Sequence, residues 1–323
     1  MLESTAHSTT PSEPAPSSGP ARRAGQVATF LDLIKFAHSI FALPFALIAS
    51  FWAFRVSGIA PLSGRGLRLL GLVLLCMVFA RTWAMTFNRL VDRRFDAANP
   101  RTAKRPSVTG AVSVTFMRAT LAVCFAGFLV ATAGFWFFEN NVWPLILAVP
   151  VLAWLASYSY TKRFTALCHF WLGISLGLAP VSAWISTGPE AGFGPRHLTI
   201  LLLGGGVAFW VAGFDILYAL QDEAFDRGEH LHSIPARVGR SRALLISRAC
   251  HVACLLLFAG VGAFGGFHAL YWCGFACAVL LLAIEQSIVS TADISRINIA
   301  FMTANGLIGL LFGALAIADT LVW

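Results

Sequence analysis

Two clusters of acidic residues stand out, because each lies at the end of an apolar segment long enough to cross a membrane. Their members are Asn88, Asp92 and Asp96 in the first cluster, and Asp215, Tyr218, Asp222 and Asp226 in the second. Carboxylates are costly at membrane depth and are rare there unless they do chemistry or bind ions. The pair of clusters therefore predicts a divalent-metal site inside a helical bundle.

The spacing within each cluster favours one face of a helix. An α-helix turns by about 100° per residue, so Asn88, Asp92 and Asp96 share a face. Spacings of seven and four residues give the second cluster a narrower stripe, with Tyr218 one turn from Asp215. Hard oxygen ligands suit Mg²⁺, which commonly joins carboxylates to phosphate oxygens. Two facing stripes therefore predict a site that holds a diphosphate through Mg²⁺.

A helix that simply ends in solvated charges is the plain alternative. For Asp96 or Asp226 taken alone, that alternative stays open. It does not account for the whole set, because the pattern Asp-x3-Asp occurs at the ends of two apolar segments. Carboxylates brought together without a metal would also repel each other.

Basic residues near the clusters are candidates to neutralise a departing diphosphate. They are Arg101, Lys104 and Arg105 after the first cluster, and Lys162 and Arg163 after the aromatic stretch Tyr158-Ser159-Tyr160-Thr161. Membrane topology is the competing explanation, and we prefer it for Arg93, Arg94, Arg240 and Arg242. Arg81 lies seven residues before Asn88, on the same predicted face, and an Arg inside a span needs a partner.

The elements that must position these residues are membrane helices. Of the 323 residues, 58% are hydrophobic and 12% are charged, whereas about a quarter of a soluble domain is charged. Apolar blocks of about 20 residues separated by short polar loops predict an all-α, polytopic membrane protein with nine transmembrane helices. The expected spans are residues 31–54, 67–88, 116–138, 143–160, 168–187, 199–220, 242–264, 268–287 and 297–319.

The N-terminal segment has a different composition from the rest. Residues 1–26 are rich in Ser, Thr, Pro and Ala and lack an apolar core, which predicts a disordered cytoplasmic tail before one transmembrane domain over residues 27–323. Lys35 and His38 lie one turn apart in the first expected span, where a snorkelling Lys beside a packed His is the preferred interpretation. The roles of His230 and His232 stay open.

The net charge of +8 does not indicate nucleic-acid binding. The basic residues flank apolar spans, and no zinc-ribbon, helix-turn-helix or aromatic-basic pattern accompanies them. Lys and Arg are concentrated in the loops that carry both acidic clusters, as the positive-inside rule expects of cytoplasmic loops. We therefore expect a multi-pass protein of the cell (inner) membrane, with the N-terminus and the site in the cytoplasm.

A weak internal echo connects the two clusters. Asp92-x3-Asp96 is followed by Arg105-Pro106 and Gly110, and Asp222-x3-Asp226 is followed by Ile234-Pro235 and Gly239. Two related helical halves that meet at a central site would produce this pattern. Coincidence among common loop residues is the open alternative.

These motifs resemble those of the UbiA superfamily of intramembrane aromatic prenyltransferases, and the resemblance extends from about residue 30 to the C-terminus. The family motif NDxxDxxxD is matched here by Asn88-Arg89-x-x-Asp92-x-x-x-Asp96, so Arg89 replaces the usual Asp. The second motif matches Tyr218-x-x-x-Asp222-x-x-x-Asp226, and a Tyr-to-Lys-Arg turn matches Tyr158 to Arg163. The surrounding residues resemble a 4-hydroxybenzoate polyprenyltransferase subgroup that is often tied to the futalosine route to menaquinone.

The resemblance implies a bundle of nine transmembrane helices around a cytoplasm-facing pocket that binds Mg²⁺ and a polyprenyl diphosphate. The implied metal ligands are Asn88, Asp92, Asp96, Asp222 and Asp226. The implied catalytic residues are Asp92, Asp222, Lys162, Arg163, Tyr218 and Asp215, and the implied substrate-binding residues are Arg81, Tyr158, Arg101 and Lys104. An allylic cation would attack an electron-rich aromatic acceptor, and proton loss would restore the aromatic ring.

Several alternatives stay open at this point. The acceptor can be 4-hydroxybenzoate, in quinone biosynthesis, or 1,4-dihydroxy-6-naphthoate, in menaquinone biosynthesis. A haem or chlorophyll prenylase would need a wider pocket. A cation-coupled transporter would also use intramembrane carboxylates, but it predicts them near mid-span on broken helices, whereas both clusters lie at the cytoplasmic ends of apolar segments.

Overall fold

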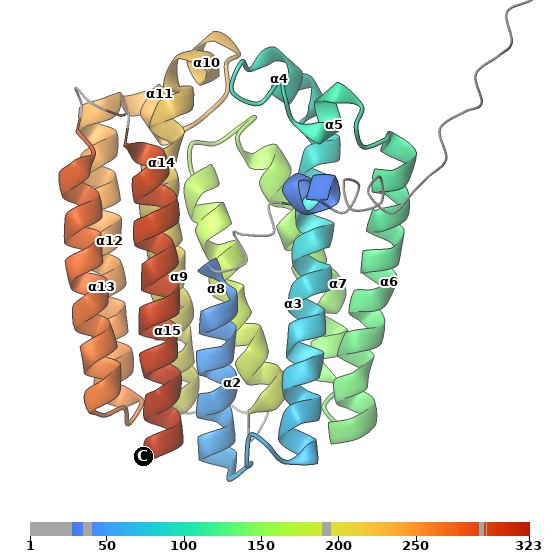
Figure 1. The fold of residues 1–323 in the computed structure, drawn as a ribbon, viewed down its shortest axis with the longest axis vertical. Helices are drawn as coiled ribbons and strands as arrows, with labels where there is room; N and C mark the ends of the chain where they lie inside the picture. Colours follow the sequence, from blue (N-terminus) through green and yellow to red (C-terminus); the bar gives the residue numbers. More distant parts are fainter. Residues whose placement is uncertain (1–27, 35–40, 189–194, 291–293, 295) are drawn as a thin grey trace, which may run out of the picture.

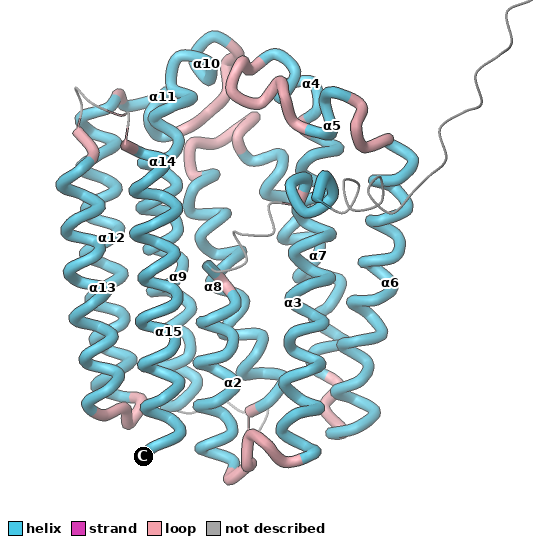
Figure 2. The backbone as a smooth tube through the Cα atoms, in the orientation of Figure 1, coloured by secondary structure: helices cyan, strands magenta, loops and turns pink. Residues whose placement is uncertain are grey.

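A computed structural model describes the whole chain except residues 1–27, 35–40, 189–194, 291–293 and 295, and the described part contains helices and loops but no strand (Figure 2). The all-α prediction is therefore confirmed. The long helices are α2 (Leu43–Ser57), α3 (Gly64–Val91), α6 (Val114–Glu139), α7 (Trp143–Thr161), α8 (Cys168–Thr187), α9 (Pro195–Ala219), α12 (Arg240–Phe264), α13 (Ala269–Ile288) and α15 (Asn305–Val322). The short elements are α4 (Arg93–Ala98), α5 (Pro106–Thr109), η2 (Leu220–Asp222), α10 (Glu223–Gly228), α11 (Ile234–Val238), α14 (Ile297–Ile299) and the π-helical η3 (Ala300–Ala304).

Within the described residues, 8 helices are long and apolar enough to cross a membrane, and α2, with 15 residues, is shorter. The expected first span, residues 31–54, is not one helix in the described part. Residues 28–33 form a separate short helix, and α2 begins only at Leu43, next to Pro44. Proline favours the first turn of a helix because its missing N–H is not needed there. The count of nine spans therefore stays a prediction.

Two of the sequence predictions lie outside the described residues. They are the disordered tail over residues 1–26 and the pair Lys35 and His38.

The helices form two groups that share α8 (Figure 1). In one group, α2 packs against α8 and α15, α9 packs against α8 and α12, and α13 packs against α15. This group encloses the main core, whose largest buried side chains include Trp52, Trp184 and Trp210. In the other group, α6 packs against α3 and α7, and α7 packs against α8. Glycines allow the closest approach, since a Cβ on Gly173 would collide with the carbonyl oxygen of Ala208.

The backbone follows the same course twice, in what we call the first unit (α3, α4, α5 and α6) and the second unit (α9, η2, α10, α11 and α12). The break after each long helix falls on an Asp with nearly the same dihedral angles: Asp92 has φ −93° and ψ 5°, and Asp222 has φ −101° and ψ 2°. A proline-initiated short helix then ends at a glycine of positive φ, which is 81° at Gly110 and 78° at Gly239. The echo seen in the sequence thus corresponds to repeated local structure.

Both units turn at the same end of the bundle, which we call the motif end. It carries α4, α5, α10 and α11, and the C-terminus lies at the opposite end (Figure 1). Both acidic clusters are therefore brought to one end of the molecule.

Candidate active site

Two cavities meet inside the bundle. The polar cavity, about 310 Å³, lies toward the motif end and is lined by both acidic clusters. The apolar cavity, about 400 Å³, extends along α3, α6, α7 and α8. The two cavities share the lining residues Arg81, Met85, Asn88, Tyr158, Leu172 and Leu176. A ligand with a charged head and a long apolar tail fits this pair of spaces.

The structure brings together almost all of the predicted site residues. The polar cavity is lined by Arg81, Asn88, Asp92, Asp96, Arg101, Tyr158, Lys162, Arg163, Asp215, Tyr218, Asp222 and Asp226. Lys104 is the exception, because it is exposed and lines neither cavity.

The first cluster does not lie on one continuous helix, which corrects the expected stripe. Helix α3 ends at Val91, and Asp92 caps it before α4 begins. The break lets the chain cross the end of the bundle. Even so, the Asp92 N–H bonds to the Asn88 carbonyl at 2.9 Å and the Asp96 N–H bonds to the Asp92 carbonyl at 2.8 Å. The three side chains therefore still reach the same cavity.

The second cluster departs from an ideal stripe in the same way. Helix α9 ends at Ala219, and the chain passes through the 3₁₀ turn η2 before α10. Asp215 therefore lies on α9, Asp222 at the break and Asp226 on α10. Spacing correctly predicted that these carboxylates gather, but not that each cluster spans a helix break.

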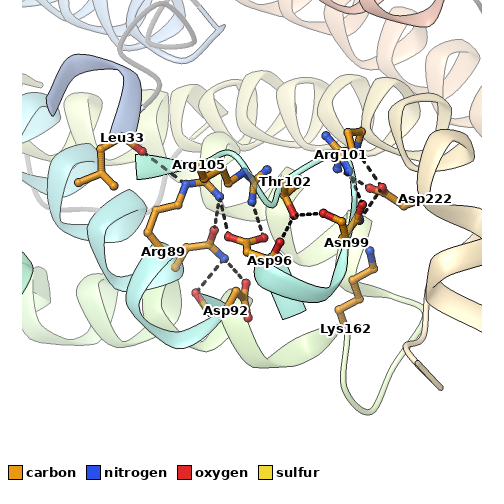
Figure 3. A network of polar contacts seen from close by, with 12 residues as sticks. Leu33, Arg89, Asp92, Asp96, Asn99, Arg101, Thr102, Arg105, Lys162 and Asp222 are labelled. Carbon is orange, nitrogen blue, oxygen red and sulfur yellow. Dashed lines mark hydrogen bonds and ion pairs between the residues drawn. The ribbon is translucent and has the colours of Figure 1, made fainter. Parts of the chain in front are cut away.

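Cations from three segments hold the carboxylates of the first cluster, and Figure 3 shows two of them, Arg89 and Arg105, beside Asp96. Arg105 donates to Asp96 Oδ1 at 2.6 Å, and Arg89 Nη1 lies 3.9 Å from Asp96 Oδ2. Asp92 accepts from Asn88 at 2.7 Å and from Arg163 at 3.1 Å. Burial raises the pKa of Asp92 above its ordinary value, and the hydrogen bond from Arg163 opposes that shift.

The second cluster is held by residues of the first unit and of the α7–α8 loop. Arg101 grips Asp222 with two N–H groups, at 2.8 Å and 2.5 Å, and Asn99 donates to the same carboxylate at 3.0 Å (Figure 3). Lys162 Nζ lies 2.7 Å from Asp226, whose side chain is fully buried. Burial acts to lower the pKa of Arg101, but Asp222 outweighs it and leaves that pKa raised.

Asp215 is oriented by a histidine that the sequence analysis missed. His169 Nδ1 lies 2.7 Å from Asp215 Oδ2, and the backbone N–H of Ile234 donates to His169 Nε2 at 3.3 Å. These partners assign the tautomer with the proton on Nδ1. A lone His at the start of an apolar segment was the available signal. Asn99 was also missed, since a polar residue in a loop carries no such signal.

Other predicted residues occupy the edges of the polar cavity. Arg101 donates to the Tyr218 hydroxyl at 3.0 Å, which links the first unit to α9. The Arg163 guanidinium lies over the Tyr160 ring, 5.0 Å from its centroid. Arg81 and Tyr158 line both cavities, so they mark the junction between polar and apolar space.

The donor set fits a divalent cation such as Mg²⁺, although it does not form a closed cage. Across the described ranges, no three His, Cys, Asp or Glu residues converge on one point. Asp96 Oδ2 is buried without a hydrogen-bond partner among the described residues, and thus offers a hard oxygen. Mg²⁺ usually keeps waters and binds through one or two carboxylates plus substrate phosphates. Two separated carboxylate clusters suit that mode of binding.

Comparisons with known proteins identify the family of this chain. The UbiA prenyltransferase family model matches residues 41–316. A 4-hydroxybenzoate octaprenyltransferase of Methylobacillus flagellatus is 30% identical over 243 residues, which cover 75% of this chain and 78% of the relative.

Solved structures give the same fold. The apo structure of a UbiA homologue from Aeropyrum pernix K1 is 33% identical, with a TM-score of 0.76, and the match covers 87% of this chain and 98% of that one. A UbiA homologue from Archaeoglobus fulgidus bound to DMAPP and Mg²⁺ is 19% identical, with a TM-score of 0.64, over 91% of this chain and 100% of that one.

Proposed function

Because the chain belongs to the UbiA prenyltransferase family, we propose that it transfers a polyprenyl group from a polyprenyl diphosphate to an aromatic acid of the 4-hydroxybenzoate type, with Mg²⁺ as cofactor. The observation that carries the proposal is the junction of the two cavities. A carboxylate-rich and cation-rich space meets a long apolar space at Arg81, Asn88 and Tyr158.

The apolar cavity would take the prenyl tail. It is lined mainly by aliphatic and aromatic side chains, such as Val73, Leu147 and Phe135. Placing the tail there puts the reactive carbon beside the junction residues and the diphosphate in the polar cavity. Burial of the tail supplies binding energy away from the reacting bond.

Asn88, Asp92, Asp96, Asp222 and Asp226 would hold Mg²⁺, which supplies Lewis-acid stabilisation of the diphosphate leaving group. The protein contributes cations of its own. Arg101, Lys162 and Arg163 line the cavity and reach motif carboxylates over 2.5–3.1 Å. The same side chains can turn to phosphate oxygens and stabilise the charge that develops as the carbon–oxygen bond breaks.

The acceptor would react in the part of the polar cavity beside Asp215 and Tyr218. The allylic cation forms a new carbon–carbon bond with the electron-rich ring, and the ring then loses a proton. Asp215 would take that proton, because it lines the cavity and His169 fixes its orientation. Tyr218 lies one helical turn further along α9 and would contact the acceptor or the diphosphate.

The protein would lie in the cell (inner) membrane with its motif end in the cytoplasm. This orientation rests on the charge distribution, since the short segments at the motif end carry Arg101, Lys162, Arg237 and many of the other basic residues. A water-soluble diphosphate headgroup and an aromatic acid would both reach the polar cavity from that side.

A product assay tests the proposal. Purified protein in detergent is incubated with Mg²⁺, with geranyl or a longer polyprenyl diphosphate, and with 4-hydroxybenzoate or 1,4-dihydroxy-6-naphthoate in parallel. We expect a prenylated product from one acceptor, and its loss when EDTA removes the metal. If only the naphthoate is prenylated, it replaces 4-hydroxybenzoate as the proposed acceptor. If no product forms and no diphosphate is released, the proposal fails and the transporter alternative remains.

A further inference from the structure

A network of buried polar side chains joins four helices, and none of its members lines either cavity. Its members are Trp210 on α9, Ser247 and His251 on α12, Glu285 and Gln286 on α13, and Asn305 on α15. Polar groups within a membrane bundle are costly, so a network joining four helices calls for a role.

Glu285 is the most costly member. Its side chain is 1% exposed, and its Oε1 accepts from Asn305 Nδ2 at 2.6 Å. Its Oε2 accepts no hydrogen bond from any residue the structure describes, and His251 Nδ1 is 3.9 Å away. Replacing such a carboxyl by an apolar side chain would lower the desolvation cost. Its presence therefore points to a task other than stability.

The network leads directly to the polar cavity. Asn305 Oδ1 accepts from the Trp210 indole N–H at 2.7 Å. The Trp210 ring meets Phe214 edge-on, with centroids 5.3 Å apart, and Phe41 at 6.2 Å. Phe41 and Phe214 both line the polar cavity. The orientation of the indole is thus set on one side by Asn305, and it supports the cavity wall on the other.

A second branch reaches the same helix. Gln286 donates to the Ser247 hydroxyl at 2.9 Å, and Ser247 donates to the Gly213 carbonyl at 2.8 Å. Gly213 precedes Asp215 by two residues, and a Cβ at Gly213 would collide with the His251 ring. The two branches therefore brace α9 on the turns that carry Phe214 and Asp215.

The π-helical segment η3 immediately precedes Asn305. A π-helical turn is rare and is often found at functional sites. The Asn305 side chain bridges Glu285 and Trp210. The irregular turn changes the helical phase just before Asn305, and so helps to set the direction in which its side chain points.

The wall that the network supports is distinct from the prenyl path. Phe41, Val211 and Phe214 line the polar cavity but not the apolar one, whereas Met85, Leu172 and Leu176 line both. A prenyl tail in the apolar cavity would therefore not contact the first three side chains. Phe41 and Phe214, each 3% exposed, present aromatic edges to the cavity beside Asp215, and Val211 is fully buried. An aromatic ring packs well against such edges.

We propose that Glu285 is a positioning residue, which acts through Asn305 and Trp210 to hold the Phe41–Val211–Phe214 wall against the aromatic ring of the acceptor. The proposal rests on the proposed function for the identity of the acceptor. The coupling between Glu285 and the wall is independent of the proposed function.

The test compares Glu285→Leu with Glu285→Gln and with a matched control. Gln keeps an oxygen that accepts from Asn305, whereas Leu removes it. Asp319→Leu is the control, because Asp319 is also a buried carboxyl. It accepts from the His268 and Tyr271 N–H groups at the opposite end and does not line either cavity.

Two quantities are measured for each variant. The first is the KM for the aromatic acceptor beside the KM for the prenyl diphosphate. We expect Glu285→Leu to raise the acceptor KM roughly tenfold, since a buried partner is lost, and to leave the prenyl diphosphate KM within about twofold. Glu285→Gln should retain the wild-type acceptor KM, and Asp319→Leu should destabilise the protein without this selective effect.

The second quantity is amide hydrogen exchange, which needs no turnover. Glu285→Leu should speed exchange in peptides covering residues 41–45 and 210–216, and Glu285→Gln and Asp319→Leu should not. Unchanged exchange there, or equal changes in both KM values, overturns the proposal. If the wild type prenylates no aromatic acid, the proposed function fails, and exchange at the wall still decides whether Glu285 positions it.

Discussion

The first and second units share a backbone course but differ in what surrounds their carboxylates. In the first unit, Asp92 is 25% exposed and Asp96 is 9% exposed, and both contact arginines. In the second unit, Asp222 is 9% exposed and Asp226 is fully buried. The partners of Asp222, Asn99 and Arg101, come from the loop of the first unit. The repeated backbone therefore carries an asymmetric site.

The helices of the two units also face different surroundings. Helices α3 and α6 of the first unit line the apolar cavity, and none of its described lining residues lies on α9 or α12. Helices α9 and α12 instead contact the buried polar network around Glu285. One unit thus provides a path for an apolar chain, and the other provides a braced wall. A repeated fold can divide binding tasks between its copies through side chains alone.

Removing one carboxylate from each unit gives the largest expected effect. We expect Asp92→Asn and Asp222→Asn each to lower kcat roughly 10³-fold, because each would lose a ligand of the Mg²⁺ that stabilises the negative charge on the departing diphosphate. Product formation by purified variants measures this effect, and chromatography in detergent checks that they remain folded. Full activity in either variant would show that only one unit works in the reaction.

The contact between the units gives the next effect. Arg101→Ala removes the cation that donates two hydrogen bonds to Asp222 and that would turn to the diphosphate. It should raise the KM for the prenyl diphosphate roughly 100-fold, as expected for loss of a charge-assisted contact. Lys104→Ala is the matched control from the same loop, because Lys104 is exposed and lines neither cavity. Equal effects of the two substitutions would mean that the loop acts through its net charge rather than through Arg101.

The apolar cavity, which of the two units only the first lines, should make the reaction sensitive to the length of the prenyl donor. Ala80→Phe on α3 narrows this cavity and should lower kcat/KM about tenfold for longer prenyl donors relative to geranyl diphosphate. Val130→Phe on α6 is the control, since Val130 is 73% exposed and does not line the cavity. A uniform loss for all donor lengths would place the prenyl tail elsewhere.

The glycines that end the short helices give the smallest effects. Gly110 has φ 81° and ψ 2°, which is near the left-handed helical region, whereas Gly239 has φ 78° and ψ 167°, a region that is essentially restricted to glycine. Gly110→Ala should cost about 1 kcal/mol of stability, and Gly239→Ala about 3 kcal/mol. Thermal unfolding in detergent measures both, and the opposite order would contradict the assigned backbone difference.

Much of the candidate site could be proposed from the sequence, because the proposal rests on residue type and on helical spacing. Carboxylates at the ends of apolar segments are costly without a function, so Asp92, Asp96, Asp222 and Asp226 could be found from the sequence. Lys162 and Arg163 followed from an aromatic-rich turn. The sequence could not show that Arg101 lines the cavity and Lys104 does not, because both are basic residues of the same loop.

Other features had weak sequence signals. The network of Trp210, Glu285 and Asn305 joins residues that are far apart in the chain, so no local period reveals it. The helix breaks at Asp92 and Asp222 were also missed, because four-residue spacing fits a continuous helix equally well.

The sequence by itself determined the membrane-helix composition, the two acidic motifs and the family, because these depend on apolar length and on residue identity along the chain. Only the tertiary structure decided which cation meets which carboxylate, that His169 orients Asp215, and that one cavity is polar and the next apolar. Those features depend on how helices approach across the bundle. That approach is set by side-chain packing between distant segments, and no spacing within one segment encodes it.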